Sequence, residues 1–235
     1  ENLKAKTDTK VISLHSQFRS LWWEDYVKFI DKIFAGDLDS QTIFESSQYE
    51  LFMFDSMEKF TEVIHKRDSE IWLSRIVAGY SWPWQSKKDT SLYDIEIDNT
   101  KLRWNSQSSD WINSDNAVHE VWCIHTTQWY DLNYVWVIFG HEITYNTDTN
   151  QIEIISDNYH DKNGKMSVTD SRQLKDYIIN IYKTIMLRGI KGTYIYVCDI
   201  NLRKYLSNFI KQHESWQVVE LKQNWKKQSS LPIRS

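Results

Sequence analysis

The chain has 235 residues, which is enough for one large α/β domain or at most two small ones. Its 28 Lys and Arg residues against 32 Asp and Glu residues give a formal net charge of −4, so the overall basic charge of many nucleic-acid-binding proteins is absent. Hydrophobic residues make up 41% of the chain and charged residues 26%, a composition that excludes a disordered protein and is typical of a globular one.

The sequence has no signature of a membrane or secreted protein. No apolar run approaches the length of about 18 residues that a transmembrane helix needs, and the first residues lack the apolar segment of a signal peptide. Cys123 and Cys198 stand far apart, in apolar stretches, with neither a zinc-site spacing nor a disulfide framework. These features favour a reducing, cytoplasmic setting.

Apolar patterning predicts strands and helices in alternation along the chain. Compact apolar or alternating runs predict strands at 10–14, 49–54, 74–80, 120–124, 134–139 and 193–197. Apolar residues at helical spacing predict helices over 24–34, from a cap at 55–58 to residue 65, over 172–187 and over 202–210. Two hairpins are expected, one joining 93–97 to 101–105 and one joining 142–145 to 151–155.

This alternation predicts an α/β fold with a mainly parallel sheet, helices on both faces and two inserted β-hairpins. The spacing Asp55-x-x-Glu58 is expected to cap the helix that follows, and Gly189 to close the long helix in the left-handed conformation. The domain is expected to cover residues 1–212, followed by a polar tail over 213–235.

Common catalytic and nucleotide-binding motifs are missing from the sequence. There is no Gly-x-x-x-x-Gly-Lys-Ser/Thr phosphate loop, no Gly-x-Gly-x-x-Gly, no His-Glu-x-x-His and no Gly-x-Ser-x-Gly. The seven histidines are scattered, so that for each of them a surface or core role is expected before a ligand role. The chain therefore carries no phosphate cradle and no metal site of its own that the sequence reveals.

Three segments do carry a joint signal. The first is Gln17-Phe18-Arg19-Ser20, directly after a predicted strand. The second runs over 123–131 (CIHTTQWYD) and precedes the strand at 134–139. The third runs over 182–189 (YKTIMLRG), at the end of the long helix and before the strand at 193–197. In this order and context they resemble motifs IV, V and VI of superfamily one helicases, the set that belongs to the second RecA-like domain.

A closer resemblance, over about residues 10–210, is to the Schlafen group three DNA/RNA helicase domain. It rests on the segments 16–20, 52–56, 77–84, 104–105, 120–137 and 180–197, of which 77–84 (VAGYSWPW) is the most specific. The resemblance implies a RecA-like fold of the P-loop NTPase type. The aromatic residues Trp82 and Trp84 are themselves expected to form a core cluster on one strand face rather than to contact a ligand.

The resemblance also implies roles for individual residues. Arg19 and Arg188 would be catalytic and reach the γ-phosphate of ATP across a cleft between two domains, where the planar guanidinium suits developing phosphoryl charge. An ordinary surface ion pair is the alternative for each arginine. The resemblance assigns nucleotide binding to Gln17, Gln128, Asp131 and Gly189, with Asp131 facing the ribose, and nucleic-acid binding to His125 and Thr126.

The tryptophan content is unusual for such a domain. The chain has 12 Trp and only 6 Gly, whereas average usage of about 7% would give roughly 16 glycines. Trp122, Trp129 and Trp136 stand where the family has Gly, the pair Trp22-Trp23 falls on a Gly-containing turn, and Trp72 is a further candidate. Either nucleotide function has been lost, or UGA codons that the organism reads as Gly were translated as Trp. Peptide masses over residues 121–136 of the native protein separate these two explanations.

The expected function is that of the C-terminal RecA-like half of a superfamily-one-type DNA/RNA helicase or nucleic-acid-dependent ATPase. ATP and Mg²⁺ would be bound mainly by an N-terminal RecA-like half, so that this chain alone is expected to be inactive. Single-stranded DNA or RNA and that N-terminal half are the expected partners, with no membrane. The alternative is a non-catalytic module that binds nucleic acid or protein and uses its Trp residues as a stacking surface. A Walker A motif in the upstream reading frame, or a start codon near Glu1, would separate the two.

Overall fold

The computed structural model describes residues 21–39, 42–107, 110–127, 130–166, 168 and 170–213, with only the backbone at Leu21 and Trp22. The expected strand at 10–14 and all but the first residue of the expected tail over 213–235 lie outside these residues. Within them, no helix is long and apolar enough to cross a membrane.

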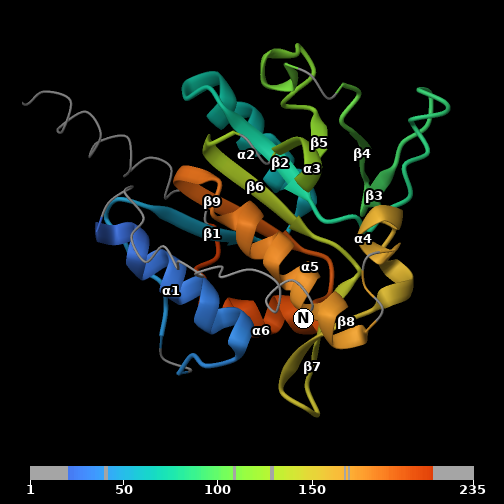
Figure 1. Ribbon diagram of the computed structural model, residues 1–235. Coiled ribbons are helices and arrows are strands. Elements are labelled where there is room, and N and C mark those ends of the chain that lie inside the picture. The colour runs from blue at the N-terminus through green and yellow to red at the C-terminus, as the bar shows by residue number, and fades with distance from the viewer. Residues whose placement is uncertain are drawn as a thin grey trace, which may run out of the picture.

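Seven strands form one sheet in the order β1-β9-β6-β2-β5-β4-β3 (Figure 1). They are β1 (Glu50–Phe54), β2 (Ser74–Ala78), β3 (Ile95–Ile97), β4 (Thr100–Trp104), β5 (Glu120–Cys123), β6 (Leu132–Phe139) and β9 (Gly189–Val197). Every neighbouring pair is parallel except β3 and β4, which form the first expected hairpin. The second hairpin, β7 (Ile143–Asn146) with β8 (Gln151–Ile154), forms a separate two-stranded sheet. The predicted α/β fold with a mainly parallel sheet is confirmed.

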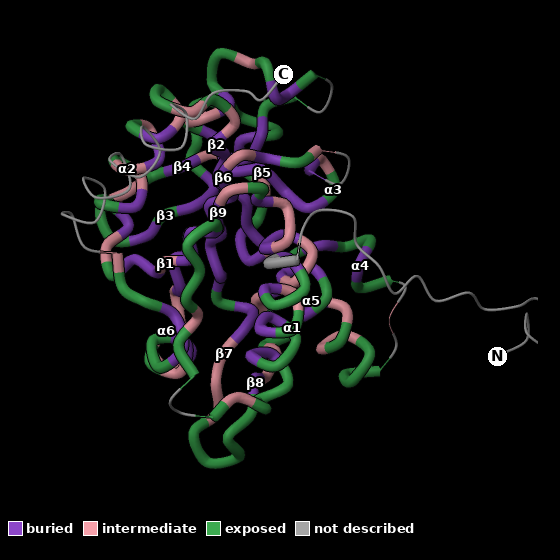
Figure 2. The backbone as a smooth tube through the Cα atoms, turned by 90° about the vertical axis from the view of Figure 1, so that its left-hand side faces the viewer, coloured by how far each residue is buried: buried purple, intermediate pink, exposed green. Residues whose placement is uncertain are grey.

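Helices cover both faces of this sheet, because side chains along each central strand alternate between two apolar layers. One layer holds α1 (Leu21–Ala35), α5 (Ser171–Met186) and α6 (Ile200–Ser207), and the other holds α2 (Met57–Glu70). Along β6, the side chains that face the first layer are Val135, Val137 and Phe139, and those that face the second are Tyr134, Trp136 and Ile138. The central strands are accordingly buried along their length, with exposed residues on the outer sides of the helices (Figure 2).

Short helical segments complete the fold. These are two 3-10 turns, η1 (Trp111–Asn113) and η2 (Ser156–Asn158), and two short helices, α3 (Ile124–Thr127) and α4 (Lys162–Met166). The helix α3 begins directly after β5, and α4 begins directly after Asp161. The helix α3 thus follows a strand of the main sheet directly, whereas α4 follows a loop.

Three local predictions differ from the structure. The cap of α2 is Ser56, whose side chain accepts a hydrogen bond from the Lys59 N–H group, while Asp55 lies one residue too early. The strand β2 ends at Ala78, so Trp82 and Trp84 lie in the loop after it rather than on a strand. Gly189 is the first residue of β9 and has no positive φ; a Cβ atom there would collide with the Gly192 carbonyl oxygen. Close backbone approach, not a left-handed turn, requires glycine at 189.

Candidate functional site

Arg188 and Asp131 lie side by side at one edge of the main sheet. Arg188 follows the end of α5 and precedes β9, and Asp131 precedes β6. Since β6 and β9 are neighbouring parallel strands, their first residues meet, and the Leu132 N–H group donates to the Arg188 carbonyl at 2.9 Å. The Arg188 guanidinium Nη1 is 3.9 Å from Asp131 Oδ1. The structure thus brings together two of the residues that the sequence assigned to nucleotide chemistry.

Both side chains of this pair reach solvent. The exposed fraction is 22% for Arg188 and 38% for Asp131. They stand at the edge where β6 and β9 begin, and Arg188 lies just after the end of α5. The other residues of the predicted nucleotide site, Gln17, Arg19 and Gln128, lie outside the described residues. Gly189 adjoins Arg188 and is buried in β9.

His125 and Thr126 lie in α3, directly after the last residue of β5. Because β5 runs parallel to β2 and so to β6, they stand at the opposite edge of the sheet from Arg188 and Asp131. The His125 side chain is 42% exposed and its Nε2 lies 3.0 Å from Oδ2 of Asp161, which is buried. The Thr126 hydroxyl donates to the Cys123 carbonyl at 2.9 Å. The predicted site residues therefore form two groups rather than one.

Asp161 is a residue that sequence reasoning missed. Its carboxylate receives the His125 contact, a hydrogen bond from the Tyr159 hydroxyl at 3.3 Å and one from the Asn163 N–H group at 3.0 Å. Burial raises the pKa of Tyr159, and the neighbouring Asp161 charge raises it further. Nothing in the spacing of Asp161 from His125 signals this contact, because the two residues come together only through the fold.

Glu142 is a second residue that the sequence did not single out. It follows β6, is fully buried, and accepts a hydrogen bond of 2.6 Å at Oε1 from the Tyr182 hydroxyl, which itself accepts one of 3.0 Å from the Gly140 N–H group. Burial raises the pKa of the Glu142 carboxyl above its ordinary value. A carboxyl held in this way favours its neutral form and acts as an internal hydrogen-bonding group.

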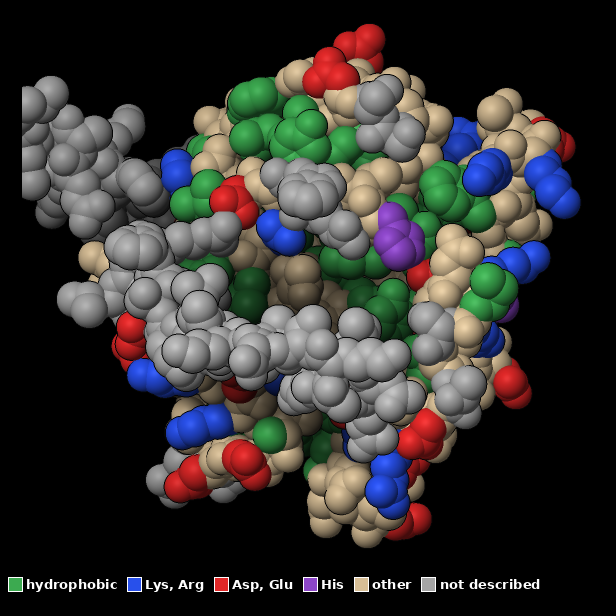
Figure 3. All heavy atoms as spheres, viewed as in Figure 1, with side chains coloured by type: hydrophobic (Ala, Val, Ile, Leu, Met, Phe, Trp, Pro, Cys, Tyr) green, Lys and Arg blue, Asp and Glu red, His purple; other side chains and the backbone are tan. Residues whose placement is uncertain are grey.

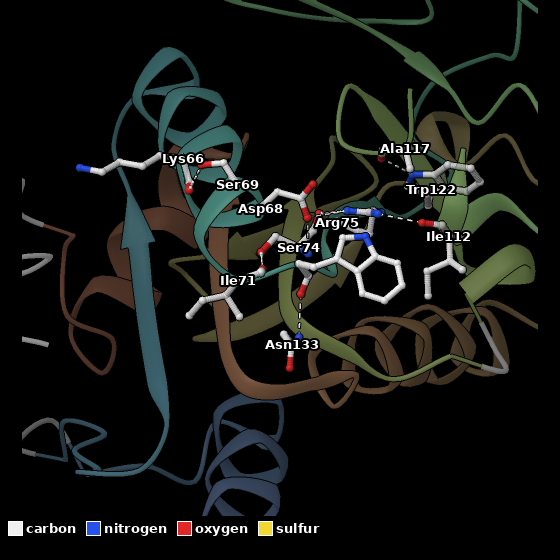
Figure 4. A network of polar contacts seen from close by, with 11 residues as sticks. Lys66, Asp68, Ser69, Ile71, Ser74, Arg75, Ile112, Ala117, Trp122 and Asn133 are labelled. Carbon is white, nitrogen blue, oxygen red and sulfur yellow. Dashed lines mark hydrogen bonds and ion pairs between the residues drawn. The ribbon is translucent and has the colours of Figure 1, made fainter. Parts of the chain in front are cut away.

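Arg75 stands near the amino end of β2 but is occupied within the fold (Figure 4). It is 2% exposed, and its guanidinium donates to Asp68 Oδ1 and to the carbonyls of Ser74 and Ile112, each at 2.8 Å. In the same region Asn133 donates to the Trp72 carbonyl at 2.6 Å. Arg75 thus ties α2 and η1 to the sheet and is not presented to a ligand.

The recorded tryptophans occupy contrasting environments. Trp122 is buried, donates from Nε1 to the Ala117 carbonyl at 2.8 Å and lies against Trp111 (Figure 4). Trp136 is also buried, yet its Nε1 has no hydrogen-bond partner among the described residues. Trp72 is 57% exposed, and Trp129 lies outside the described residues. Trp23 is buried in α1, so the four positions whose side chains are described do not share one structural role.

The described residues contain no group of three or more His, Cys, Asp or Glu side chains that could hold a metal ion. Acidic and basic side chains are interspersed on the face seen in Figure 3, without a single large basic patch.

Comparisons with known proteins identify the family. The family model described as "Schlafen group 3, DNA/RNA helicase domain" matches residues 1–199. The chain is also similar to an uncharacterized protein of Saccharomyces cerevisiae (strain ATCC 204508 / S288c), with 28% identity over 167 residues, a stretch that covers 67% of this chain and 36% of the yeast protein. The chain thus matches about a third of that relative's length. No solved structure is significantly similar to it. With most of its length matched by that model, the chain belongs to the Schlafen group 3 DNA/RNA helicase domain family.

Proposed function

We propose that this chain is the second RecA-like domain of a superfamily-one-type helicase or nucleic-acid-dependent ATPase, and that Arg188 reaches the γ-phosphate of ATP held by a partner domain. The observation that carries the proposal is the pair of Arg188 and Asp131, side by side at the sheet edge with 22% and 38% of their side chains exposed. A guanidinium that acts on phosphate bound elsewhere must project from its own domain, as this one does.

The geometry of the pair suits a group that must move its charge to a ligand. At 3.9 Å, the Arg188–Asp131 contact is looser than the 2.8 Å contact of Arg75 with Asp68. A partly exposed ion pair contributes little stability, so that a phosphate can replace or share the carboxylate at small cost. Asp131 would then orient the guanidinium while the nucleotide is absent and lie beside the ribose when it is present.

ATP is the expected substrate, and Mg²⁺ would be held by the domain that carries the phosphate loop. The described residues offer no group of three metal ligands, and the sequence has no Walker A motif, so neither is assigned to this chain. What this chain contributes is the planar, fixed charge of Arg188 near the transferred phosphoryl group.

Nucleic acid would contact the opposite edge, at His125 and Thr126. His125 is 42% exposed and is oriented by the buried carboxylate of Asp161. Since Nε2 faces Asp161, a phosphate oxygen would be met by Nδ1, which donates in the doubly protonated form of the ring, and the oriented ring loses little rotational freedom in doing so. Contacts at one edge and ATP at the other fit a domain that couples nucleic-acid binding to ATP hydrolysis through its central sheet.

The test is ATP hydrolysis by this chain joined to a domain that carries the Walker A motif. We expect hydrolysis to be stimulated by single-stranded nucleic acid. Arg188→Lys keeps the charge but loses the planar donors, so turnover should fall on the order of 10³-fold while nucleotide affinity falls far less. Arg172→Lys, at an exposed position of α5, is the matched control and should leave turnover unchanged.

Each measurement is made with the unchanged chain and with the triple variant Trp122→Gly, Trp129→Gly, Trp136→Gly. The triple variant is needed because the family has Gly at these three positions, so that a Trp there would by itself lower the turnover. Unchanged turnover after Arg188→Lys in the triple variant would show that Arg188 is not the arginine that acts on ATP. Nucleic-acid binding without any ATP hydrolysis in both backgrounds would support the non-catalytic module instead.

A further inference from the structure

A pocket of about 460 Å³ lies beside the carboxyl end of β4, and neither the family description nor the proposed ATP site accounts for it. Its wall includes the rings of Trp84 and Trp104, the basic side chains Lys87 and Arg103, and the polar residues Gln107 and Glu120. We propose that this pocket binds one nucleotide of a single-stranded nucleic acid, with the base against the tryptophans and the phosphate at the basic rim. This inference rests on the nucleic-acid role in the proposed function and assigns that role a second contact site.

The aromatic wall of the pocket is continuous with His125. Ring centroids follow one another from Trp84 to Trp104 at 6.3 Å, from Trp104 to Tyr80 at 5.4 Å and from Tyr80 to His125 at 5.7 Å. These spacings are those of rings in contact. A strand whose phosphate meets His125 could therefore continue along this row and place a neighbouring base in the pocket.

The pocket contains a buried donor that lacks an acceptor. Trp104 is 1% exposed, and its indole Nε1 makes no hydrogen bond within the described part of the chain. An unpaired buried donor is costly, and most such groups in folded proteins find a partner. The carbonyl oxygens and ring nitrogens of a nucleobase are acceptors of the kind that would satisfy it if the Trp104 ring turned its buried N–H group toward the pocket. The Gln107 side chain lines the same pocket and offers both an amide donor and an acceptor to a base edge.

The charges at the rim suit a phosphate. The Lys87 ammonium lies 5.5 Å from the Trp84 ring centroid, so a base stacked on Trp84 would have its phosphate near this cation. Arg103 donates to the Leu92 carbonyl at 2.9 Å, which holds its guanidinium over the Tyr93 ring. Glu120 is the one acidic side chain in the wall, and its Oε2 accepts from the Ser106 N–H group at 3.0 Å. The carboxylates of Glu120 and of Asp94, which lies behind the wall, are bonded internally, whereas the Lys87 and Arg103 side chains present their cations at the rim.

Asp94 keeps the pocket in shape. This buried carboxylate accepts hydrogen bonds from the Gln85 N–H group at 2.6 Å, the Ser86 N–H group at 2.8 Å, the Ser86 hydroxyl at 2.5 Å and the Trp104 N–H group at 2.9 Å. It thereby fixes the loop that carries Trp84 against the end of β4. A preformed site of this kind loses little conformational entropy when a base enters.

The experiment measures binding of a fluorescently labelled oligo-dT or oligo-U to the full 235-residue chain by anisotropy. Trp84→Ala removes one stacking face and should weaken binding about tenfold or more, whereas Trp84→Phe should retain most of the affinity. Trp72→Ala, at a tryptophan that is 57% exposed and remote from the pocket, is the matched control and should change affinity less than about twofold.

A second pair of variants leaves all the aromatic side chains of the pocket in place. Lys87→Glu at the rim should weaken binding about tenfold, whereas Lys88→Glu, the adjacent exposed lysine outside the pocket wall, changes the net charge equally and should have a much smaller effect. Free AMP, UMP and ATP are tested as competitors, and each should compete far more weakly than the unlabelled oligonucleotide.

Three outcomes would overturn the pocket proposal: equal affinities for Trp84→Ala and the unchanged chain, equal effects of Lys87→Glu and Lys88→Glu, or tighter binding of ATP than of oligonucleotide. Arg172→Lys, at an exposed position of α5, is included and should leave oligonucleotide binding unchanged. If the pocket variants have no effect while the unchanged chain binds oligonucleotide and turns over ATP, the pocket proposal is wrong and the proposed function still stands. Absence of any oligonucleotide binding contradicts both.

Discussion

Three arginines of this protein differ in burial and in how closely they contact a carboxylate. The Arg67 guanidinium is 2.9 Å from Glu50 Oε2 and 3.1 Å from the Tyr194 hydroxyl, and Arg75 is 2.8 Å from Asp68 Oδ1. Both side chains are nearly inaccessible to solvent. Removing one partner of such a buried pair leaves an uncompensated charge, which makes these two residues structural. Arg188, partly exposed beside Asp131, is the one of the three to which we assign a ligand in the proposed function.

Glu142 provides a prediction on pH at the scale of a single residue. Burial raises the pKa of its carboxyl above the ordinary 4.5, so the folded protein binds this proton more tightly than the unfolded chain does. The resulting stability is present below about pH 4.5 and is lost as pH rises toward the folded-state pKa, by about 1.4 kcal/mol for each pH unit in that window. Glu142→Gln mimics the neutral acid and should flatten the fall in melting temperature as the pH rises above 4.5.

The control for this prediction is Glu62→Gln, an exposed carboxylate on α2. Its pH profile should follow that of the unchanged protein, since the buried Glu142 carboxyl is still present in this variant. Parallel profiles for Glu142→Gln and the unchanged protein would mean that Glu142 is ionised in the fold.

At the scale of elements, β9 lies between the edge strand β1 and the other five strands of the sheet. It pairs with β1 on one side and β6 on the other, so its start has to bring Gly189, Gly192 and the first residues of β6 close together. A Cβ atom at 189 would meet the backbone carbonyl of Gly192, and backbone cannot turn aside as a flexible side chain can. The same crossing places Arg188 next to Asp131.

Gly189→Ala should therefore lower the free energy of unfolding by about 3 kcal/mol, near the upper end of overpacking costs. Gly36→Ala is the comparison: φ is +75° at Gly36 but no atom lies within 4 Å of the added Cβ, so only the backbone penalty of about 1 kcal/mol applies. Urea titration of both variants measures the difference. A smaller loss at 189 than at 36 would show that β9 can shift to accept a side chain.

For the whole molecule, the distribution of charge limits how nucleic acid can bind. The net charge is −4, and basic and acidic side chains are mixed on the face in Figure 3. On the proposed function, we therefore expect binding to depend on a small number of phosphate contacts together with stacking, which salt does not screen.

The salt dependence of oligonucleotide binding tests this view. With Lys87 and Arg103 neutralising two phosphates of a single strand, the slope of log association constant against log salt concentration should be about −1.4. Anisotropy titrations between about 50 and 300 mM KCl give this slope. A slope steeper than about −4 would indicate an extended basic path elsewhere on the protein.

Several features could be predicted from the sequence because they depend on local burial. Segments with the apolar spacing of a strand alternate along the chain with segments that have the apolar spacing of a helix. This alternation by itself predicts a mainly parallel α/β sheet covered on both faces. The same local patterns located β1, β2, β5, β6 and β9, and motif order identified Arg188, Asp131, His125 and Thr126 as candidates. Errors were confined to element ends, as at Ser56 and Gly189, where a cap or a close approach depends on one or two contacts.

The tertiary structure alone decided which of these residues meet. The strand order β1-β9-β6-β2-β5-β4-β3 sets Asp131 beside Arg188 and puts His125 at the opposite edge, next to Asp161. It also buries Glu142 against Tyr182 and assembles the pocket between Trp84 and Trp104. The spacing of apolar residues in a segment indicates which of its side chains are buried. The pairing of distant segments depends instead on how all side chains pack together. Contacts between segments far apart in the chain therefore leave no local signal to read.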